Sequence, residues 1–205
     1  MRALPMMILS LVSGAPAKGL GAEIPPGHAA EAPTEVEPKR YRVEVNLIQP
    51  FVPTVGIIRP KLAVNLWGDP SGASGDLVVG AYLRPHIEHD ILFHIDEYLA
   101  TLGYRQYLYR GLHLEALLNG GAAWGTNRYD GKFYRTPSVF VDLNLGYRLA
   151  FFEPGGLLEE VEWPVGIFIT AQAGVLFSVG VADIGPRNGK PDVFPQAELL
   201  AGVSF

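Results

Sequence analysis

The sequence predicts an all-β fold, an eight-stranded antiparallel up-and-down transmembrane β-barrel over residues 40–205. Two observations lead to this prediction. From Arg40 onward apolar residues recur at every second position, and several alternating stretches last for about ten residues, the length a tilted strand needs to cross a bilayer. The chain also contains 24 Gly and 17 Pro, which favour many turns over a helical bundle.

The period-two alternation predicts the strands in chain order. In one of them, Val141 and Leu143 fall on the face opposite Asp142. Proline and histidine interrupt the alternation over residues 49–60 and 86–97, where the strand bounds are least defined. The expected strands are residues 40–49, 57–67, 76–85, 97–109, 112–125, 137–152, 163–183 and 194–205, and eight is the smallest even number known for membrane barrels.

The connections between these strands are of two kinds. Tyr109 to Gly111 and Glu153 to Gly156 predict very short turns, whereas residues 126–136 and 185–193 predict long polar loops. Short turns on one rim and long loops on the other are typical of outer-membrane barrels. We therefore expect the long loops to face outward from the cell.

The N-terminal segment has the pattern of an export signal. Met1 and Arg2 give a positive start, Leu4 to Val12 give a short apolar run, and small residues follow before Ala22. The sequence thus predicts a signal peptide over residues 1–22 and a flexible periplasmic leader, rich in proline and acid, over residues 23–39. The apolar run is too short for a membrane helix.

The strands have one polar and one apolar face, and two solvents fit that pattern. In a soluble periplasmic barrel the apolar face is the core, whereas in a membrane barrel it meets lipid. The apolar positions often hold Ala and Gly, the polar positions include many neutral residues, and aromatic residues gather near strand ends, as interfacial girdles do. These features favour the membrane barrel, with a paired interior polar network of Arg42, Glu44, Lys61, Arg105, His113, Glu115, Asp142, Arg148 and Glu198.

The last strand ends in an alternating apolar series on an aromatic residue: Leu199, Ala201, Val203 and Phe205. In this feature and in its architecture over residues 40–205, the chain resembles small bacterial outer-membrane barrels of the OmpA transmembrane-domain and OmpX type. The resemblance implies that these four residues are an assembly signal for the barrel-assembly machinery. It also implies contact with outer-membrane lipid and lipopolysaccharide in a Gram-negative-type bacterium.

Composition excludes several kinds of function. The chain has no cysteine, so disulfides, thiolate metal sites and cysteine nucleophiles are ruled out. Its net charge is -5 without a basic cluster, which argues against nucleic-acid binding. No phosphate-binding glycine pattern or nucleophile elbow occurs, and we expect no cofactor.

A catalytic alternative rests on His113 and Glu115, which share one face of a strand and have the residue types of a base and its orienting group. A lipid-modifying hydrolase is therefore the leading alternative function. The deacylase barrels that act on lipid A carry a serine two residues from the histidine, where this chain has Glu115. The two residues also face the expected interior, away from a lipid substrate.

Histidines gather at His86, His89 and His94, the densest set of possible metal ligands. Residues three apart on a strand point to opposite faces, which separates His86 from His89. We therefore expect a polar loop without a metal site.

These observations together predict a monomeric outer-membrane barrel of structural or interaction type without catalytic activity. The interior of eight strands is narrow enough to be filled by side chains, so an open, porin-like channel is not expected. The hydrolase that uses His113 and a soluble periplasmic β-barrel that binds an apolar ligand remain as alternatives.

Overall fold

The structure, a computed structural model, describes residues 39–52, 56–69, 72–88, 92–153, 156–158, 163–181 and 193–205. Its elements are β1 (Tyr41–Asn46), η1 (Gln49–Phe51), β2 (Pro60–Gly68), β3 (Ser74–Ile87), β4 (Leu92–Tyr109), β5 (Leu112–Asn127), β6 (Phe133–Phe151), β7 (Gly166–Val181) and β8 (Val193–Ser204). In this part of the chain no helix is long and apolar enough to cross a membrane. The expected signal peptide and all but the last residue of the expected leader lie outside it.

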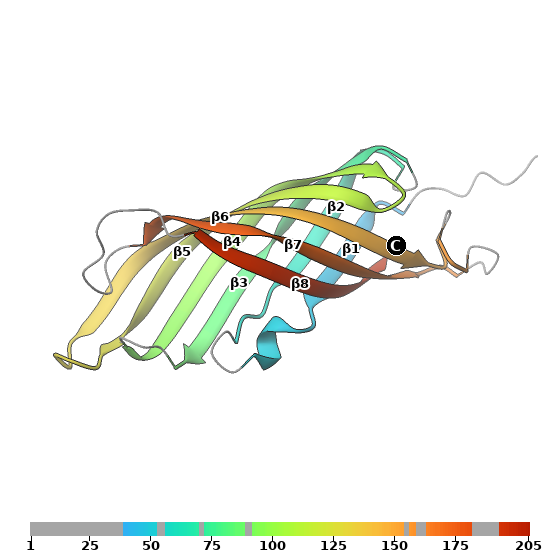
Figure 1. The fold of residues 1–205 in the computed structure, drawn as a ribbon. Helices are drawn as coiled ribbons and strands as arrows, with labels where there is room; N and C mark the ends of the chain where they lie inside the picture. The colour runs from blue at the N-terminus through green and yellow to red at the C-terminus, as the bar shows by residue number, and fades with distance from the viewer. Residues whose placement is uncertain are drawn as a thin grey trace, which may run out of the picture. The chain divides into compact units, whose positions relative to one another are not determined.

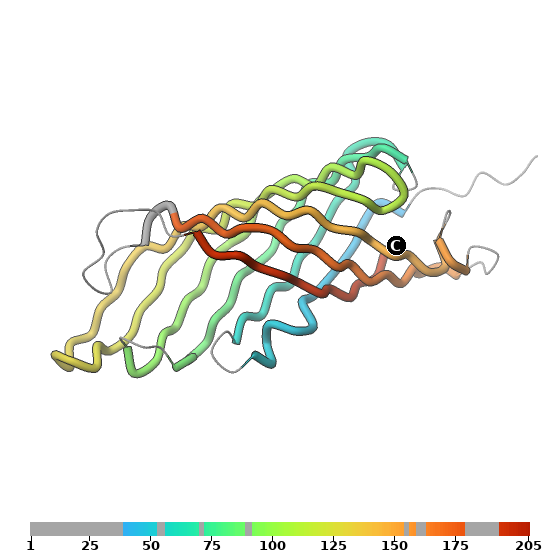
Figure 2. Tube along the Cα trace, in the orientation of Figure 1, coloured from blue at the N-terminus to red at the C-terminus, as the bar shows by residue number. Residues whose placement is uncertain are grey.

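Each strand pairs with the next in an antiparallel ladder, and β8 pairs with β1 to close a barrel (Figure 1). The first and last strands therefore lie side by side (Figure 2), with Val43 opposite Val203. The backbones of Tyr41 and Phe205 exchange two hydrogen bonds of 3.0 Å at the end of this seam. The predicted eight-stranded antiparallel up-and-down barrel is confirmed.

Alternation along the strands assigns one face to the lumen and the other to the outer surface. On β5, His113 and Asn119 are fully buried, whereas Leu114 and Leu118 are about half exposed. The period-two pattern holds because successive side chains leave a strand on opposite sides. Leu200 is an apolar residue on the inward face of β8, and it is also fully buried.

The prediction of a long loop over residues 126–136 is wrong. β5 continues to Asn127 and β6 starts at Phe133, with Thr126 paired to Phe133, so only a short turn separates the strands. Backbone ladder bonds do not depend on side-chain polarity, and polar residues can therefore extend a hairpin. In Figure 1 this hairpin (yellow) reaches farther from the C-terminus than the start of β8 does.

The expected break over residues 86–97 is also narrower than predicted. β3 runs to Ile87 and β4 starts at Leu92, and register shifts on both strands accommodate the irregular residues. The first strand, by contrast, is shorter than expected. It ends at Asn46, whose Oδ1 accepts the backbone N–H of Gln49 at 3.0 Å, and η1 follows.

The turns confirm one expectation and contradict another. The turn after Tyr109 consists of Arg110 and Gly111, both with positive φ (43° and 86°), as a tight hairpin requires. At Glu153 the backbone N–H of Gly156 donates to the Glu153 carbonyl at 2.8 Å, as in the expected turn, but β7 starts only at Gly166, so the connection is long. It lies on the same rim as the end of β8, because Gly166 is paired with Ser204. Long connections are thus not confined to one rim. The expected loop over residues 185–193 lies outside the described residues except for Val193.

Candidate functional site

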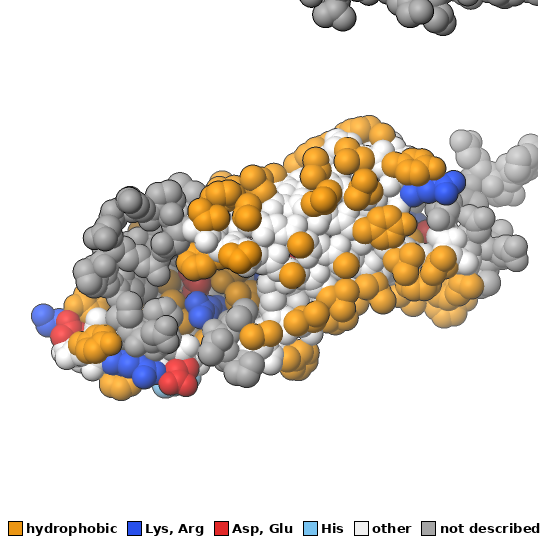
Figure 3. Space-filling model, in the orientation of Figure 1, with side chains coloured by type: hydrophobic (Ala, Val, Ile, Leu, Met, Phe, Trp, Pro, Cys, Tyr) orange, Lys and Arg blue, Asp and Glu red, His pale blue; other side chains and the backbone are white. Residues whose placement is uncertain are grey.

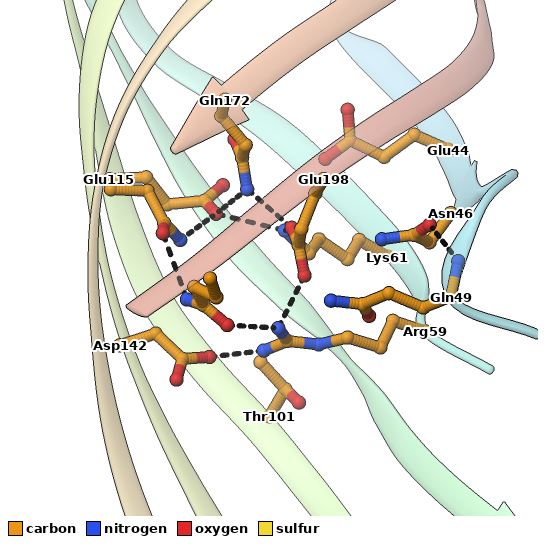
Figure 4. A network of polar contacts seen from close by, with 12 residues as sticks. Glu44, Asn46, Gln49, Arg59, Lys61, Thr101, Glu115, Asp142, Gln172 and Glu198 are labelled. Carbon is orange, nitrogen blue, oxygen red and sulfur yellow. Dashed lines mark hydrogen bonds and ion pairs between the residues drawn. The ribbon is translucent and has the colours of Figure 1, made fainter. Parts of the chain in front are cut away.

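The inward face of the barrel holds the candidate site, a network of charged side chains. All nine residues expected in an interior polar network face inward, and none is more than 5% exposed. Ion pairs connect most of them across strands that are distant in sequence. Figure 4 shows the part of this network around Arg59 and Lys61. The nine are Arg42, Glu44, Lys61, Arg105, His113, Glu115, Asp142, Arg148 and Glu198.

Arg59 and Lys61 form one centre of the network. Arg59, just before β2, donates to the carboxylates of Asp142 and Glu198. Lys61 Nζ lies 2.9 Å from Glu115 Oε1 and 3.3 Å from Glu198 Oε2. The two cations thus hold three acids from β5, β6 and β8 together in the middle of the lumen (Figure 4).

Arg105 on β4 forms the second centre. Its Nε donates to Glu115 Oε2 at 2.9 Å and its Nη1 to Glu44 Oε2 at 3.2 Å. Gln172 Nε2, on β7, donates to Glu115 Oε1 at 3.1 Å. Every acid in this part of the network therefore contacts a cation, which offsets the cost of burying its charge.

A third group lies nearer the ends of the chain. Arg42 donates to Asp76, and Arg148 Nη2 lies 2.9 Å from Glu153 Oε2. The ring of Tyr107 lies beside both guanidinium groups, whose Cζ atoms are 5.7 and 5.3 Å from its centroid. Cation–π contact and ion pairing together fill this end of the lumen.

Sequence reasoning missed several members of the network. Arg59, which pairs with two buried acids, lies in the segment where prolines obscure the alternation, although its spacing of two from Lys61 is a usable signal. Asp76 lies near the start of β3, and Glu153 follows β6, so neither showed a clear face in the sequence. Gln172 was not among the nine expected residues, although it donates to the carboxylates of Glu115 and Glu198.

His113 and Glu115 share the inward face as expected, and each is bonded to other groups. His113 Nδ1 donates to the carbonyl of Gly111 at 2.9 Å, and its Nε2 lies 3.5 Å from Gln172 Oε1. Glu115 is occupied by Lys61 and Arg105. The imidazole is fully buried against Gly146, where any Cβ would come within 2.5 Å of Nε2, so this histidine fills space.

The structure describes two of the three histidines that were considered as metal ligands. His86 and His94 lie side by side across the β3–β4 hairpin, with ring centroids 3.8 Å apart, whereas His89 lies outside the described residues. Among the residues that the structure describes, no three His, Cys, Asp or Glu side chains form a cluster suited to a metal ion.

The outward face is apolar over the middle of the barrel. On the side seen in Figure 3, hydrophobic side chains are spread along the molecule and charged ones gather towards its two ends. The four residues of the expected assembly signal lie on this face, and Phe205 stacks on Tyr41 with a centroid distance of 6.0 Å. The exposed large side chains on β4 and β5 include Leu102, Leu114 and Leu118.

This arrangement can neutralise charge and close a lumen, because its ionic groups bind one another. Comparison of the chain with protein-family models, with curated proteins and with solved structures finds no match. The functional argument therefore depends on the geometry of the barrel itself.

Proposed function

We propose that this chain is a monomeric bacterial outer-membrane β-barrel of structural or interaction type, without catalytic activity, exported by the signal peptide expected over residues 1–22. The observation that carries the proposal is the inverted polarity of the barrel. Charged side chains such as Arg105 and Glu115 are buried, while leucines such as Leu102 and Leu118 are more than half exposed. Water as the outer solvent would oppose both arrangements, and lipid favours both.

The aromatic residues support the same proposal. Trp67 donates to Tyr104 Oη at 3.0 Å on the outer surface, and Phe152 stacks on Trp163 near the end of β6. Tyr98 stacks on Trp124 towards the opposite rim, with centroids 5.2 Å apart. Aromatic side chains at both ends of an apolar surface are the pattern of membrane-interface girdles.

The filled lumen supports a barrel closed to solute flow. The ion pairs of Arg59 and Arg105 cross the lumen, and Tyr82, Leu99 and Phe140 cluster next to them. We therefore expect no conductance in planar lipid bilayers. A steady, reproducible channel current from the purified protein would contradict this part of the proposal.

The alternatives receive less support from the geometry. A soluble barrel that binds an apolar ligand needs an apolar lumen, but here the middle of the lumen holds ion pairs. The lipid hydrolase needs a histidine that a substrate can reach, and His113 is fully buried. Neither function has an observation that favours it.

The main test is the location and solubility of the full chain. After expression in a Gram-negative host, we expect recovery from the outer-membrane fraction in detergent, with gel migration that changes on heating. Recovery from the periplasm without detergent would overturn the proposal. The hydrolase predicts a changed lipid A or phospholipid profile that is lost in His113→Ala, whereas our proposal predicts unchanged profiles for both proteins.

The barrel-assembly machinery is the partner that we propose for the C-terminal strand. Phe205 is 52% exposed and its backbone closes the β1–β8 seam against Tyr41. Deletion of Phe205 should leave the protein unassembled in cells while allowing refolding into detergent. Normal insertion of the deleted chain in cells would contradict the assembly-signal role.

A further inference from the structure

The tip of the β3–β4 hairpin brings together two histidines that the sequence separates. His86 and His94 lie across the hairpin with their rings 3.8 Å apart between centroids and inclined by only 14°. The register shifts at Arg84/Ile87 and Leu92/Ile95 produce this alignment, because they displace each histidine from the regular ladder. Both side chains are exposed to solvent.

The backbone at His86 is held in an uncommon conformation. Its φ is 50°, in the left-handed region that side chains other than glycine rarely adopt. The carboxylate of Asp96 accepts the backbone N–H of His86 at 2.9 Å, and its other oxygen lies 3.9 Å from His86 Nδ1. Asp96 therefore fixes the residue that carries one imidazole and stands beside that imidazole.

Two facing imidazoles are the start of a transition-metal site. Neutral imidazole nitrogens bind Zn²⁺, Ni²⁺ and Cu²⁺. The Zn–N distance is about 2.0–2.1 Å. A carboxylate next to a ligating histidine orients the ring and raises its basicity. In the stacked arrangement the lone pairs of the two rings run nearly parallel, so both imidazoles must turn about their side-chain bonds before their nitrogens converge on one ion. Both side chains are exposed, so the hairpin leaves them room for this rotation.

We propose that His86 and His94 bind one divalent transition-metal ion, with water completing its coordination and Asp96 positioning His86. Two protein ligands agree with the absence of a three-residue ligand cluster among the described residues. The Irving–Williams order predicts that Cu²⁺ binds more tightly than Ni²⁺ or Zn²⁺, and the nitrogen ligands predict no binding of Mg²⁺ or Ca²⁺. The pair lies on an exposed hairpin, so metal binding there does not require the proposed membrane location.

The test is titration of the untagged full chain with Zn²⁺, Ni²⁺ and Cu²⁺ by calorimetry. His86→Gln and His94→Gln should each weaken binding at least about tenfold, since the loss of even an outer partner costs a metal site about that much. Two matched controls remove one imidazole from elsewhere, His89→Gln from the same hairpin and His113→Gln from the lumen. These controls should change the affinity less than about twofold.

A spectroscopic readout separates ligation from an indirect effect on the hairpin. Electron paramagnetic resonance of the Cu²⁺ complex should show coupling to two imidazole nitrogens in the natural chain and to one in either variant. The proposal is overturned if the natural chain binds none of the three ions, if His89→Gln weakens binding as much as His86→Gln, or if the variants keep two coupled nitrogens.

Discussion

The middle of the lumen and its end near the β5–β6 hairpin have opposite polarity, although the same strands build both. In the middle, Arg105, Lys61 and Glu115 are buried inside the barrel and leucines lie outside. Towards the hairpin, Leu92, Ile95 and Ala123 form an apolar cluster inside. Figure 3 shows charged side chains gathered at the ends of the outer surface.

This difference shows that alternation fixes the face of a side chain, but the surroundings fix its polarity. Where the proposed bilayer surrounds the barrel, the outer face must be apolar and the charges pair inside. Beyond the proposed bilayer, water would surround the barrel and favour apolar side chains inside, such as those of the small cluster at Leu92 and Ile95. Along β4 the inward face changes from ionic at Arg105 to mainly apolar at Leu92 and Ile95, with the buried carboxylate of Glu97, which accepts a hydrogen bond from Ser138, between them.

The largest effect should come from breaking the ion-pair network. Arg105→Met leaves Glu44 and Glu115 short of a buried partner, and we expect the free energy of unfolding to fall by about 3–5 kcal/mol. Denaturant unfolding in lipid vesicles measures the loss. The control Arg135→Met removes an exposed arginine whose guanidinium lies 5.9 Å from the Trp124 ring centroid, and it should change stability by no more than about 1 kcal/mol. Equal losses in the two variants would show that the network is not a special source of stability.

The next effect tests the outer face. Leu118 is 51% exposed in the middle of β5, and Leu118→Arg should cost about 2–4 kcal/mol if this face meets lipid. The same vesicle-based unfolding measurement detects it. Tyr129→Arg, in the β5–β6 turn where the residue is 83% exposed, serves as the control and should be nearly neutral. A neutral Leu118→Arg would place this surface in water.

A smaller effect should follow a change in the apolar end of the lumen. Ile95→Val removes one buried methylene group and should destabilise the protein by about 0.5–1.5 kcal/mol. The comparison variant is Val139→Ala, on the outward face of β6, where the removed methyl groups leave no cavity inside the barrel. If Ile95→Val has no effect on denaturant unfolding, the cluster contributes nothing to the stability of this end.

The smallest effect concerns a charge in the β5–β6 turn. A hydrogen bond from Tyr134 Oη, at 2.6 Å, and one from the backbone N–H of Lys132 lower the pKa of Asp130 below its usual value of 3.8. Because folding lowers this pKa, ionised Asp130 stabilises the turn when the pH is above the usual pKa of an aspartate side chain. This stabilisation disappears as the pH falls through the pKa of Asp130 in the folded protein.

Tyr134→Phe should therefore raise the pKa of Asp130 towards its usual value, as measured by an NMR titration of the carboxyl carbon. The change should not affect the ion-pair network, because the turn lies outside it. An unchanged pKa in the variant would show that the tyrosine hydroxyl does not stabilise the charge.

The sequence predicted the inward residues well and their partners poorly. His113, Asp142 and Glu198 were assigned to the interior because alternation is a local property of the backbone. Arg59 was missed because prolines hide the local pattern around it, and its pairing with Asp142 joins residues far apart in the chain. The stacking of His86 on His94 depends on two register shifts, which no spacing in the sequence reveals.

Local periodicity by itself determined that this protein is an eight-stranded antiparallel barrel and which side chains share a face, because both follow from the period of two. Tertiary structure decided which cation binds which acid and where the hairpins end. It also decided where an apolar core replaces the ion pairs inside the barrel. These features depend on strand register and on contacts across the lumen, and such contacts exist only once the sheet has closed.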